Sequence, residues 1–365
     1  LSPALCRFYL YGCLLCRRGN LFSLFCSPRP QSPADIHTDL SNNKILQLSE
    51  LFDGIRYIPL ETPDTALIAN VQAITYHNGR YYLIAENTLY VFNRHGQYLS
   101  QHNNQGRGAN EYNSIFQVKS SIGDSVLYVS GDNGKGHIVM AYDRNGNYLK
   151  TLIQNRSFNM EFNVLENSII ISDGRTVSLY DKQGKLENEI RISPFDSISF
   201  GTSNHLSDFS SQEVIFSCPG SDTLYFLGKS GITRKISLDY GHNQSPEQFK
   251  KSLSNPITFP YFHNFISLGK TVLDLIVIDQ KQYMIQLDLT RRTATVCDTL
   301  VNDIDHTIPY IPREIVENQG LMVLPAPVFF HFIQPEQLSA IPALRNLTED
   351  ANPVIVVLNL KSSSL

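Results

Sequence analysis

A short phrase, an apolar strand followed by a polar turn that ends on glycine, recurs along the chain and decides its fold. Its clearest copies are residues 89–96 (LYVFNRHG), 139–146 (VMAYDRNG) and 178–184 (SLYDKQG). Weaker copies follow at 225–231 (YFLGKSG) and at 285–291 (IQLDLTR), where Arg291 replaces the glycine. Asp or Asn followed by a polar pair and Gly is hairpin-turn chemistry, because glycine adopts a positive φ without a steric clash.

The spacing of this phrase indicates a propeller. Its glycines stand at positions 96, 146, 184 and 231, steps of roughly forty to fifty residues, which is the period of a four-stranded blade. Tyr, Val, Ile, Leu and Phe dominate the flanking strands, as expected for strands covered on both faces. The sequence therefore predicts an all-β fold, a six-bladed β-propeller of four-stranded blades. The third strands of the blades are expected at residues 89–93, 138–143, 177–181, 224–228, 284–289 and 354–360.

The two ends of the chain complement each other. Residues 354–360 (VIVVLNL) read as a buried strand, but only five residues follow them, too few for an outer partner strand. Residues 55–61 (IRYIPLE) form a strand without a hairpin partner, and Pro59 is tolerated in an outermost strand. We therefore expect this N-terminal strand to complete the last blade and close the ring, because an unpaired edge favours aggregation.

Three motifs carry a resemblance to a known group of proteins. They are residues 57–62 (YIPLET), 106–112 (GRGANEY) and 350–356 (DANPVIV). In this order they resemble the six-bladed β-propeller proteins of Bacteroidetes envelopes, many of them lipoproteins by sequence and without an assigned function. The resemblance covers residues 45–361 and implies export and architecture more than chemistry. The chain departs from the group at Ala109 and Asn110, where the usual pattern has Pro and Gly.

Composition is consistent with one large globular domain that does not bind nucleic acid. The 365 residues contain 42% hydrophobic residues, and residues 36–365 are expected to form a single propeller domain. The formal net charge is −4 and no basic block occurs, whereas phosphate binding requires clustered Lys and Arg. We expect a monomer.

The first 35 residues are expected to lie outside the domain, as a disordered segment or as an altered export signal with its tether. In the second interpretation Arg17 and Arg18 are the charged region, residues 21–25 the apolar run and Cys26 the lipid-modified residue. A tether rich in Ser and Pro would follow at residues 27–34. The apolar run is short for a signal, and Phe25 stands where a small residue is expected. This interpretation predicts an exported protein, periplasmic or anchored to the outer membrane through a lipid, with no other membrane contact.

Two insertions interrupt the even spacing and are each predicted to contain a short helix. The first spans about residues 243–268, with a helix starting at Ser245 and Pro246. The second spans residues 302–350, with a helix at residues 335–340. Propeller insertions are common places for function, although both segments could equally pack on the rim.

Two polar clusters are candidate sites. In the glycine-rich segment at residues 106–112, backbone amides and Arg107 could bind an anionic ligand, with Glu111 and Tyr112 beside them. The alternative is a structural turn in which Arg107 pairs with Glu111 or with the backbone.

The second cluster, Asp303, Asp305 and His306, offers three metal ligands within four residues and could begin a Ca²⁺ site. A solvated turn explains these residues as well. Otherwise no cofactor is expected.

These observations predict a binding module of the cell envelope and not an enzyme. No activated nucleophile, zinc-protease motif or nucleotide-binding glycine loop occurs in the sequence. The expected partner is an envelope protein, a peptide or a glycan. The alternative is a Ca²⁺-dependent hydrolase of the lactonase or esterase kind, which would require several Asp, Asn, Glu or His side chains to converge at the central channel.

Overall fold

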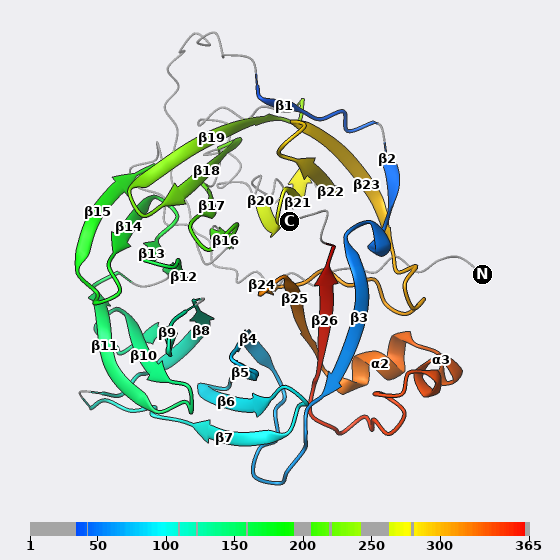
Figure 1. Ribbon diagram of the computed structural model, residues 1–365, viewed down its shortest axis with the longest axis horizontal. Coiled ribbons are helices and arrows are strands. Elements are labelled where there is room, and N and C mark those ends of the chain that lie inside the picture. Colours follow the sequence, from blue (N-terminus) through cyan, green and yellow to red (C-terminus); the bar gives the residue numbers. More distant parts are fainter. Residues whose placement is uncertain are drawn as a thin grey trace, which may run out of the picture.

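The computed structural model shows six β-sheets arranged in a ring around a central axis (Figure 1). It describes residues 34–361, with gaps at 42, 109, 122, 158–159, 193–205, 219–220, 242–262 and 279–280. Each sheet is one blade, and blades 1 to 5 run in chain order from an innermost to an outermost strand. The predicted all-β fold and its six four-stranded blades are confirmed.

The first three blades follow one another along the chain. Blade 1 contains β4 (Val71–His77), β5 (Arg80–Ala85), β6 (Thr88–Asn93) and β7 (Tyr98–His102). Blade 2 contains β8 (Ser114–Ser120), β9 (Val126–Asp132), β10 (His137–Asp143) and β11 (Tyr148–Asn155). Blade 3 contains β12 (Glu161–Val164), β13 (Ile169–Ser172), β14 (Thr176–Tyr180) and β15 (Leu186–Arg191).

The last three blades complete the ring. Blade 4 contains β16 (Leu206–Asp208), β17 (Val214–Ser217), β18 (Thr223–Gly228) and β19 (Gly231–Asp239). Blade 5 contains β20 (His263–Leu268), β21 (Thr271–Ile278), β22 (Lys281–Asp288) and β23 (Thr293–Val301). Blade 6 contains β24 (Glu314–Val316), β25 (Gln319–Leu324), β26 (Val354–Leu360) and β3 (Phe52–Pro59).

The recurring phrase forms the turn between the third and fourth strands, as its chemistry predicts. Gly146 and Gly184 have φ angles of 87° and 88°. In the turn of blade 2, the Asp143 carboxylate accepts hydrogen bonds from the backbone N–H groups of Asn145 (2.8 Å) and Asn147 (2.9 Å). The copy without glycine uses a different turn, in which Arg292 takes the positive φ of 55°.

The N-terminal strand closes the ring as expected. β3 pairs antiparallel with β26, in a register that runs from Val354↔Pro59 to Leu360↔Phe52. Asn352 reinforces the junction, because its Nδ2 donates to the carbonyls of Glu61 and Ala66, each at 2.7 Å. Its Oδ1 accepts a hydrogen bond from the N–H of Ile68 at 2.7 Å. Blade 6 is therefore built from both ends of the described chain.

The segment before β3 forms an outer strap that the sequence did not predict. β1 (Ile36–His37) and β2 (Asn43–Gln47) pair parallel with β19 and β23, and add a fifth strand to blades 4 and 5. A 3₁₀ helix, η1 (Leu48–Glu50), then leads into β3. Ile36 and Leu46 are fully buried in the apolar cores between the blades. The strap therefore links blades 4, 5 and 6 along the rim.

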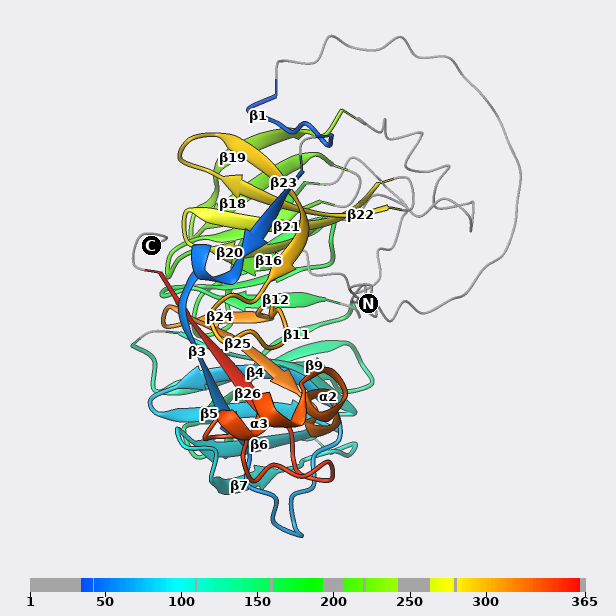
Figure 2. The same ribbon diagram turned by 90° about the vertical axis from the view of Figure 1, so that its right-hand side faces the viewer.

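Two short helices, α2 (Ala326–Phe332) and α3 (Pro335–Ala340), lie in the insertion of blade 6. Figures 1 and 2 place α2 beside blade 6, where Phe329 contacts the ring of Tyr57 edge-on at 6.0 Å. The helix predicted at residues 335–340 is confirmed, whereas α2 was not anticipated. The other predicted helix, at Ser245, and the proposed lipid site at Cys26 lie outside the described residues. Within the described part of the chain, no helix is long and apolar enough to cross a membrane.

Candidate functional site

The innermost strands of adjacent blades are joined by side-chain hydrogen bonds at a repeated sequence separation. Thr75 of β4 bonds Ser120 of β8 through their hydroxyls at 3.4 Å, and Gln117 of β8 accepts from the N–H of Phe162 of β12 at 3.3 Å. Glu161 of β12 accepts from the N–H of Leu206, which begins β16, at 3.0 Å. All three pairs are 45 residues apart. The blade repeat thus places polar side chains near the axis.

Every blade contributes a polar side chain from its innermost strand. We call this set the axial ring, and its members are Thr75, Lys119, Asn163, Asp208, Ser267 and Glu314. Thr75, Asn163 and Ser267 are at most 2% exposed. The apolar cores, in contrast, lie between adjacent blades. Polar residues have therefore replaced apolar ones where the innermost strands converge.

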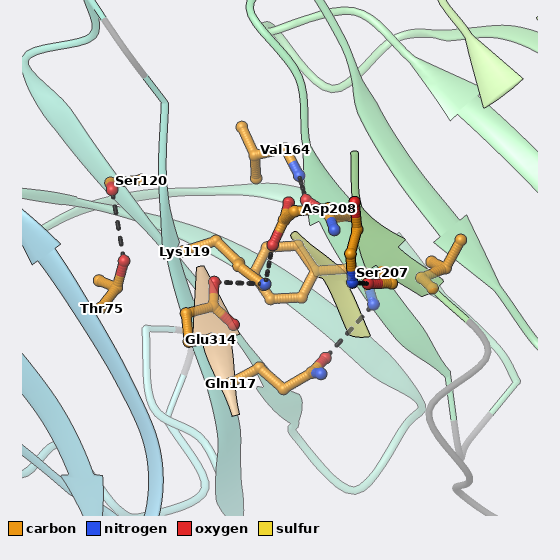
Figure 3. A network of polar contacts seen from close by, with 12 residues as sticks. Thr75, Gln117, Lys119, Ser120, Val164, Ser207, Asp208 and Glu314 are labelled. Carbon is orange, nitrogen blue, oxygen red and sulfur yellow. Dashed lines mark hydrogen bonds and ion pairs between the residues drawn. The ribbon is translucent and has the colours of Figure 1, made fainter. Parts of the chain in front are cut away.

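At the centre of the axial ring, one ammonium group bridges two carboxylates from different blades (Figure 3). Lys119 Nζ of blade 2 lies 2.8 Å from Asp208 Oδ2 of blade 4 and 2.5 Å from Glu314 Oε1 of blade 6. The Lys119 and Glu314 side chains are 11% and 14% exposed, and that of Asp208 is 29% exposed. This axial cluster joins three alternate blades, and Asp208 is its most accessible member.

The two carboxylates share too little positive charge for both to ionise freely. Burial raises the pKa of Glu314 to about 8; Lys119 lowers it, whereas the charge of Asp208 and a hydrogen bond to it raise it. Burial lowers the pKa of Lys119, but attraction to Asp208 and Glu314 outweighs burial, so this pKa is raised. With its pKa near 8, Glu314 is consequently mostly protonated at pH 7, beside a charged Lys119.

Two members of the axial ring are buried with an unsatisfied polar atom. Asn163 Nδ2 and Ser267 Oγ have no hydrogen-bond partner among the described residues. Asn163 lies two residues after Glu161, so both side chains point to the face of β12 that contacts β16. Ser267 shares a strand face with Phe265, which packs in the core between blades 4 and 5. The two groups therefore flank β16, the strand that carries Asp208.

The predicted anion site around Arg107 is a turn held by Glu111. Glu111 Oε2 accepts a hydrogen bond from the N–H of Gly108 at 2.6 Å, and Arg107 is exposed. Tyr112 is only 1% exposed, donates to the carbonyl of Asn87 at 2.8 Å and packs in the core between blades 1 and 2. Tyr112 thus contributes to packing, and ligand binding by Arg107 and Glu111 stays a prediction.

The two acids of the predicted metal site bind different neighbours. Asp303 accepts hydrogen bonds from the N–H of Ser49 at 2.9 Å and from its hydroxyl at 2.5 Å. These bonds lower the pKa of Asp303. Asp305 accepts from the hydroxyl of Tyr57 at 2.6 Å. His306, at a φ of 59°, accepts through its carbonyl from Gln337 at 3.3 Å.

No metal cluster forms around these residues in the described part of the chain, where three His, Cys, Asp or Glu side chains nowhere gather closely enough to hold an ion. The Ca²⁺ site therefore remains a prediction. Both candidate segments connect an outermost strand to the innermost strand of the next blade. Such connections share one face of the ring, because the innermost strands run in the same direction.

The sequence did not identify the axial cluster. Lys119, Asp208 and Glu314 are separated by 89 and 195 residues when counted from Lys119, and each lies in a short strand with no motif around it. The usable signal was positional. Each of the three is a charged residue on the first strand of its blade. The residues next to two of them, Val118 beside Lys119 and Ile315 beside Glu314, pack against the apolar core. Placing the blades on the axis would have brought these residues together.

The closed ring of six four-stranded sheets, with polar residues on the innermost strands, defines a six-bladed β-propeller. The chain belongs to the family described as "Domain of unknown function (DUF4934)", whose model matches residues 33–359. No curated protein matches the sequence.

Solved structures support the fold. The chain is similar to a "Putative exported protein" from Bacteroides fragilis, with a TM-score of 0.63 and 15% identity, covering 87% of this chain and 100% of that one. Weaker likenesses include a Bacteroides caccae protein of unknown function (TM-score 0.40, 10% identity, 68% and 97% coverage). Another is virginiamycin B lyase from Staphylococcus aureus (TM-score 0.44, 12% identity, 68% and 79% coverage). Nothing further about this chain follows from these two.

Proposed function

We propose that the chain is a binding module of the cell envelope without catalytic activity of its own. The observation that carries this proposal is the position of Lys119. A Ca²⁺-dependent hydrolase of the propeller type would need carboxylates that converge on a metal near the axis. Here two carboxylates do converge, but on the chain's own ammonium group. The positive charge that such a site would take from a metal is already supplied by a side chain.

A rigid ring with connecting segments on one face is suited to binding. Loops on a rigid scaffold commonly carry recognition residues. Arg107, Glu111 and Asp303 lie in such segments, and Arg107 and Glu111 are exposed. We expect the partner to be an envelope protein, a peptide or a glycan, and the module to act as a monomer.

Hydrolysis assays separate this proposal from its alternative. The full chain should show no chelator-sensitive turnover of lactones or aryl esters. The hydrolase would be supported instead if EDTA abolished turnover and Asp303→Ala, Asp305→Ala or Asp208→Asn did the same. Glu187→Gln is a matched control, because Glu187 is exposed on β15.

Location in the envelope is the second part of the proposal. Support comes from the resemblance to envelope propellers and from the Bacteroides fragilis relative described as exported. Cys26 is the candidate lipid-modified residue. Fractionation of cells that express the full chain should place it in the periplasm or outer membrane, and Cys26→Ala should release it from the membrane fraction. Recovery of the wild-type chain in the cytoplasm would contradict this assignment.

A further inference from the structure

The outer edge of β19 already holds an extended segment of the chain itself. β1 adds to this edge as a parallel strand, with Ile36 beside Leu238. Ile36 is fully buried in the core between blades 4 and 5, His37 is exposed and Thr38 is buried again. Such alternation is typical of a peptide bound by strand addition, where the backbone gives affinity and pockets for alternate side chains give specificity.

A carboxylate anchors this segment between two blades. Asp35 Oδ2 accepts hydrogen bonds from the N–H of Ser237 at 3.0 Å and from its hydroxyl at 3.1 Å. Asp35 Oδ1 lies 2.8 Å from Nη1 of Arg292, in the turn between β22 and β23. We call residues 233–239 together with Arg292 the β19 edge. Blade 4 thus provides the backbone pairing, and blade 5 provides a guanidinium group that selects an acid.

β1 covers only a small part of the β19 edge. It pairs with two residues, Leu238 and Asp239, of a strand that has nine. Arg234 and Lys235 are exposed further along, and Arg234 Nη2 is already 3.7 Å from a carboxylate oxygen of Glu213. Lys235 is therefore the better placed of the two to meet an acid from outside the chain.

The sequence before β1 explains why its own pairing is short. Three positions before Ile36 the chain has Pro33, and proline has no N–H group to donate to a ladder. A segment without this proline can pair with more of the β19 edge. Exchange of β1 between two copies of the chain would add no contact, because both copies carry the same proline.

We propose that an extended acidic segment of a partner protein adds to the β19 edge, parallel to β19, and replaces β1. This inference rests on the proposed binding function and names the partner chemistry. The partner segment has an acid for Arg292, followed by an aliphatic residue in the position of Ile36. Continuation of the register places an acid three residues before the aliphatic residue beside Lys235. The longer ladder and the added ion pair offset the high effective concentration of the tethered β1.

Fluorescence anisotropy of the full chain with labelled peptides tests the inference. The probe is the heptapeptide EEVDIHT, whose isoleucine takes the position of Ile36, and the control is KKVDIHT. We expect saturable one-to-one binding of the probe, and binding of the control weaker by about threefold or more, because its lysines face like charges. Asp35→Ala should tighten binding of the probe by up to about tenfold, because it loosens β1 and leaves the β19 edge intact.

A charge reversal connects binding to the proposed register. Lys235→Glu should reverse the preference, so that KKVDIHT binds more tightly than EEVDIHT. The matched control Lys150→Glu should keep the preference of the wild type, because Lys150 is exposed on β11, the outermost strand of blade 2.

Two results would overturn the inference. One is the absence of probe binding by both the wild type and Asp35→Ala, including the case in which Asp35→Ala forms dimers by exchanging β1. The other is an unchanged preference in Lys235→Glu. A chain that binds neither peptide and hydrolyses nothing would leave the proposed function intact, whereas chelator-sensitive turnover would contradict that function itself.

Discussion

The turns at the rim and the cluster at the axis join the blades in opposite ways. At the rim, the glycine that ends each copy of the recurring turn phrase packs against the outermost strand of the preceding blade. A Cβ added to Gly184 would lie 2.1 Å from the carbonyl oxygen of Leu152 on β11, and one added to Gly96 would lie 2.4 Å from that of Pro59 on β3. The contact depends on the absence of a side chain and on a local backbone conformation.

At the axis, the contact depends on charged side chains that are distant in sequence. Lys119 reaches residues 89 and 195 positions away, and each partner comes from an alternate blade. The comparison teaches that local backbone chemistry sets the contact between neighbouring blades at the rim. At the axis, the blades are instead joined by interactions between charged residues that are distant in sequence. A change at the rim should disturb one pair of blades, whereas a change at the axis should affect three.

Ring closure is the contact on which both regions depend, so its loss should have the largest effect. Deleting residues 1–60 removes β3 together with the buried Phe52, Tyr57 and Ile58. Loss of these large buried side chains, at about 2–5 kcal/mol each, is together comparable to a typical stability of about 5–15 kcal/mol, and the last blade also loses its outermost strand. We expect no cooperative thermal unfolding transition by circular dichroism.

Two shorter deletions serve as controls for ring closure. Removing residues 1–33 should leave the melting temperature unchanged, because the contacts of the strap begin at Asp35. Removing residues 1–47 should lower it without abolishing the transition, because β3 remains while the strap is lost. Equal melting temperatures for the deletions of 1–33 and 1–60 would contradict closure by β3.

Removing the ammonium group at the axis should have the next largest effect. Lys119→Met leaves Asp208 and Glu314 facing each other without a cation. Breaking a buried ion pair from one side typically costs about 3–5 kcal/mol. Urea denaturation at pH 7 should show this loss. The triple variant with Asp208→Asn and Glu314→Gln should recover much of it, because no charge remains unpaired. A cost below about 1 kcal/mol for Lys119→Met would mean that the cluster does not hold the blades.

The same contrast explains how much of the fold was readable in the sequence. The turn at Asp143 to Gly146 is encoded within four residues, because the Asp side chain and the glycine φ together define it. The closing strand was readable because β26 lacked a following partner. The strap was missed because β1 has only two residues and β2 only five, and both pair parallel with strands far along the chain.

The site was less readable than the fold. Glycine-rich and acidic motifs directed attention to Tyr112 and Asp303, yet Tyr112 is a core residue and Asp303 binds Ser49. Lys119 has no motif, because its two partners come from other blades. Long-range convergence of single residues leaves no local pattern in one sequence.

A matched pair of glycines tests the rim. Gly184→Ala and Gly79→Ala both place a Cβ at positive φ, at 88° and 78°, which costs about 1–2 kcal/mol. The Cβ at position 79 meets nothing within 4 Å, whereas at position 184 it would collide with the backbone of Leu152. Overpacking should add about 1–3 kcal/mol at position 184 only. If urea denaturation gave the two variants equal free energies of unfolding, the proposed packing role of Gly184 would be contradicted.

The last expected effect is confined to a range of pH, and it is the dependence of stability on pH that Glu314 introduces. Its pKa is raised from 4.5 to about 8 in the folded chain. Between these values the folded chain holds a proton that the unfolded chain has released, so the free energy of unfolding falls as pH rises. The stabilisation is fully present below pH 4.5 and is lost as pH passes 8, with a slope of at most about 1.4 kcal/mol per pH unit. Because other groups also titrate, the informative quantity is the difference between wild type and Glu314→Gln, measured by urea denaturation from pH 5 to 9. The free energy of unfolding of the wild type should fall steadily relative to that of Glu314→Gln up to about pH 8. A difference that stays constant across this range would show that Glu314 is ionised in the folded chain and forms a full ion pair with Lys119.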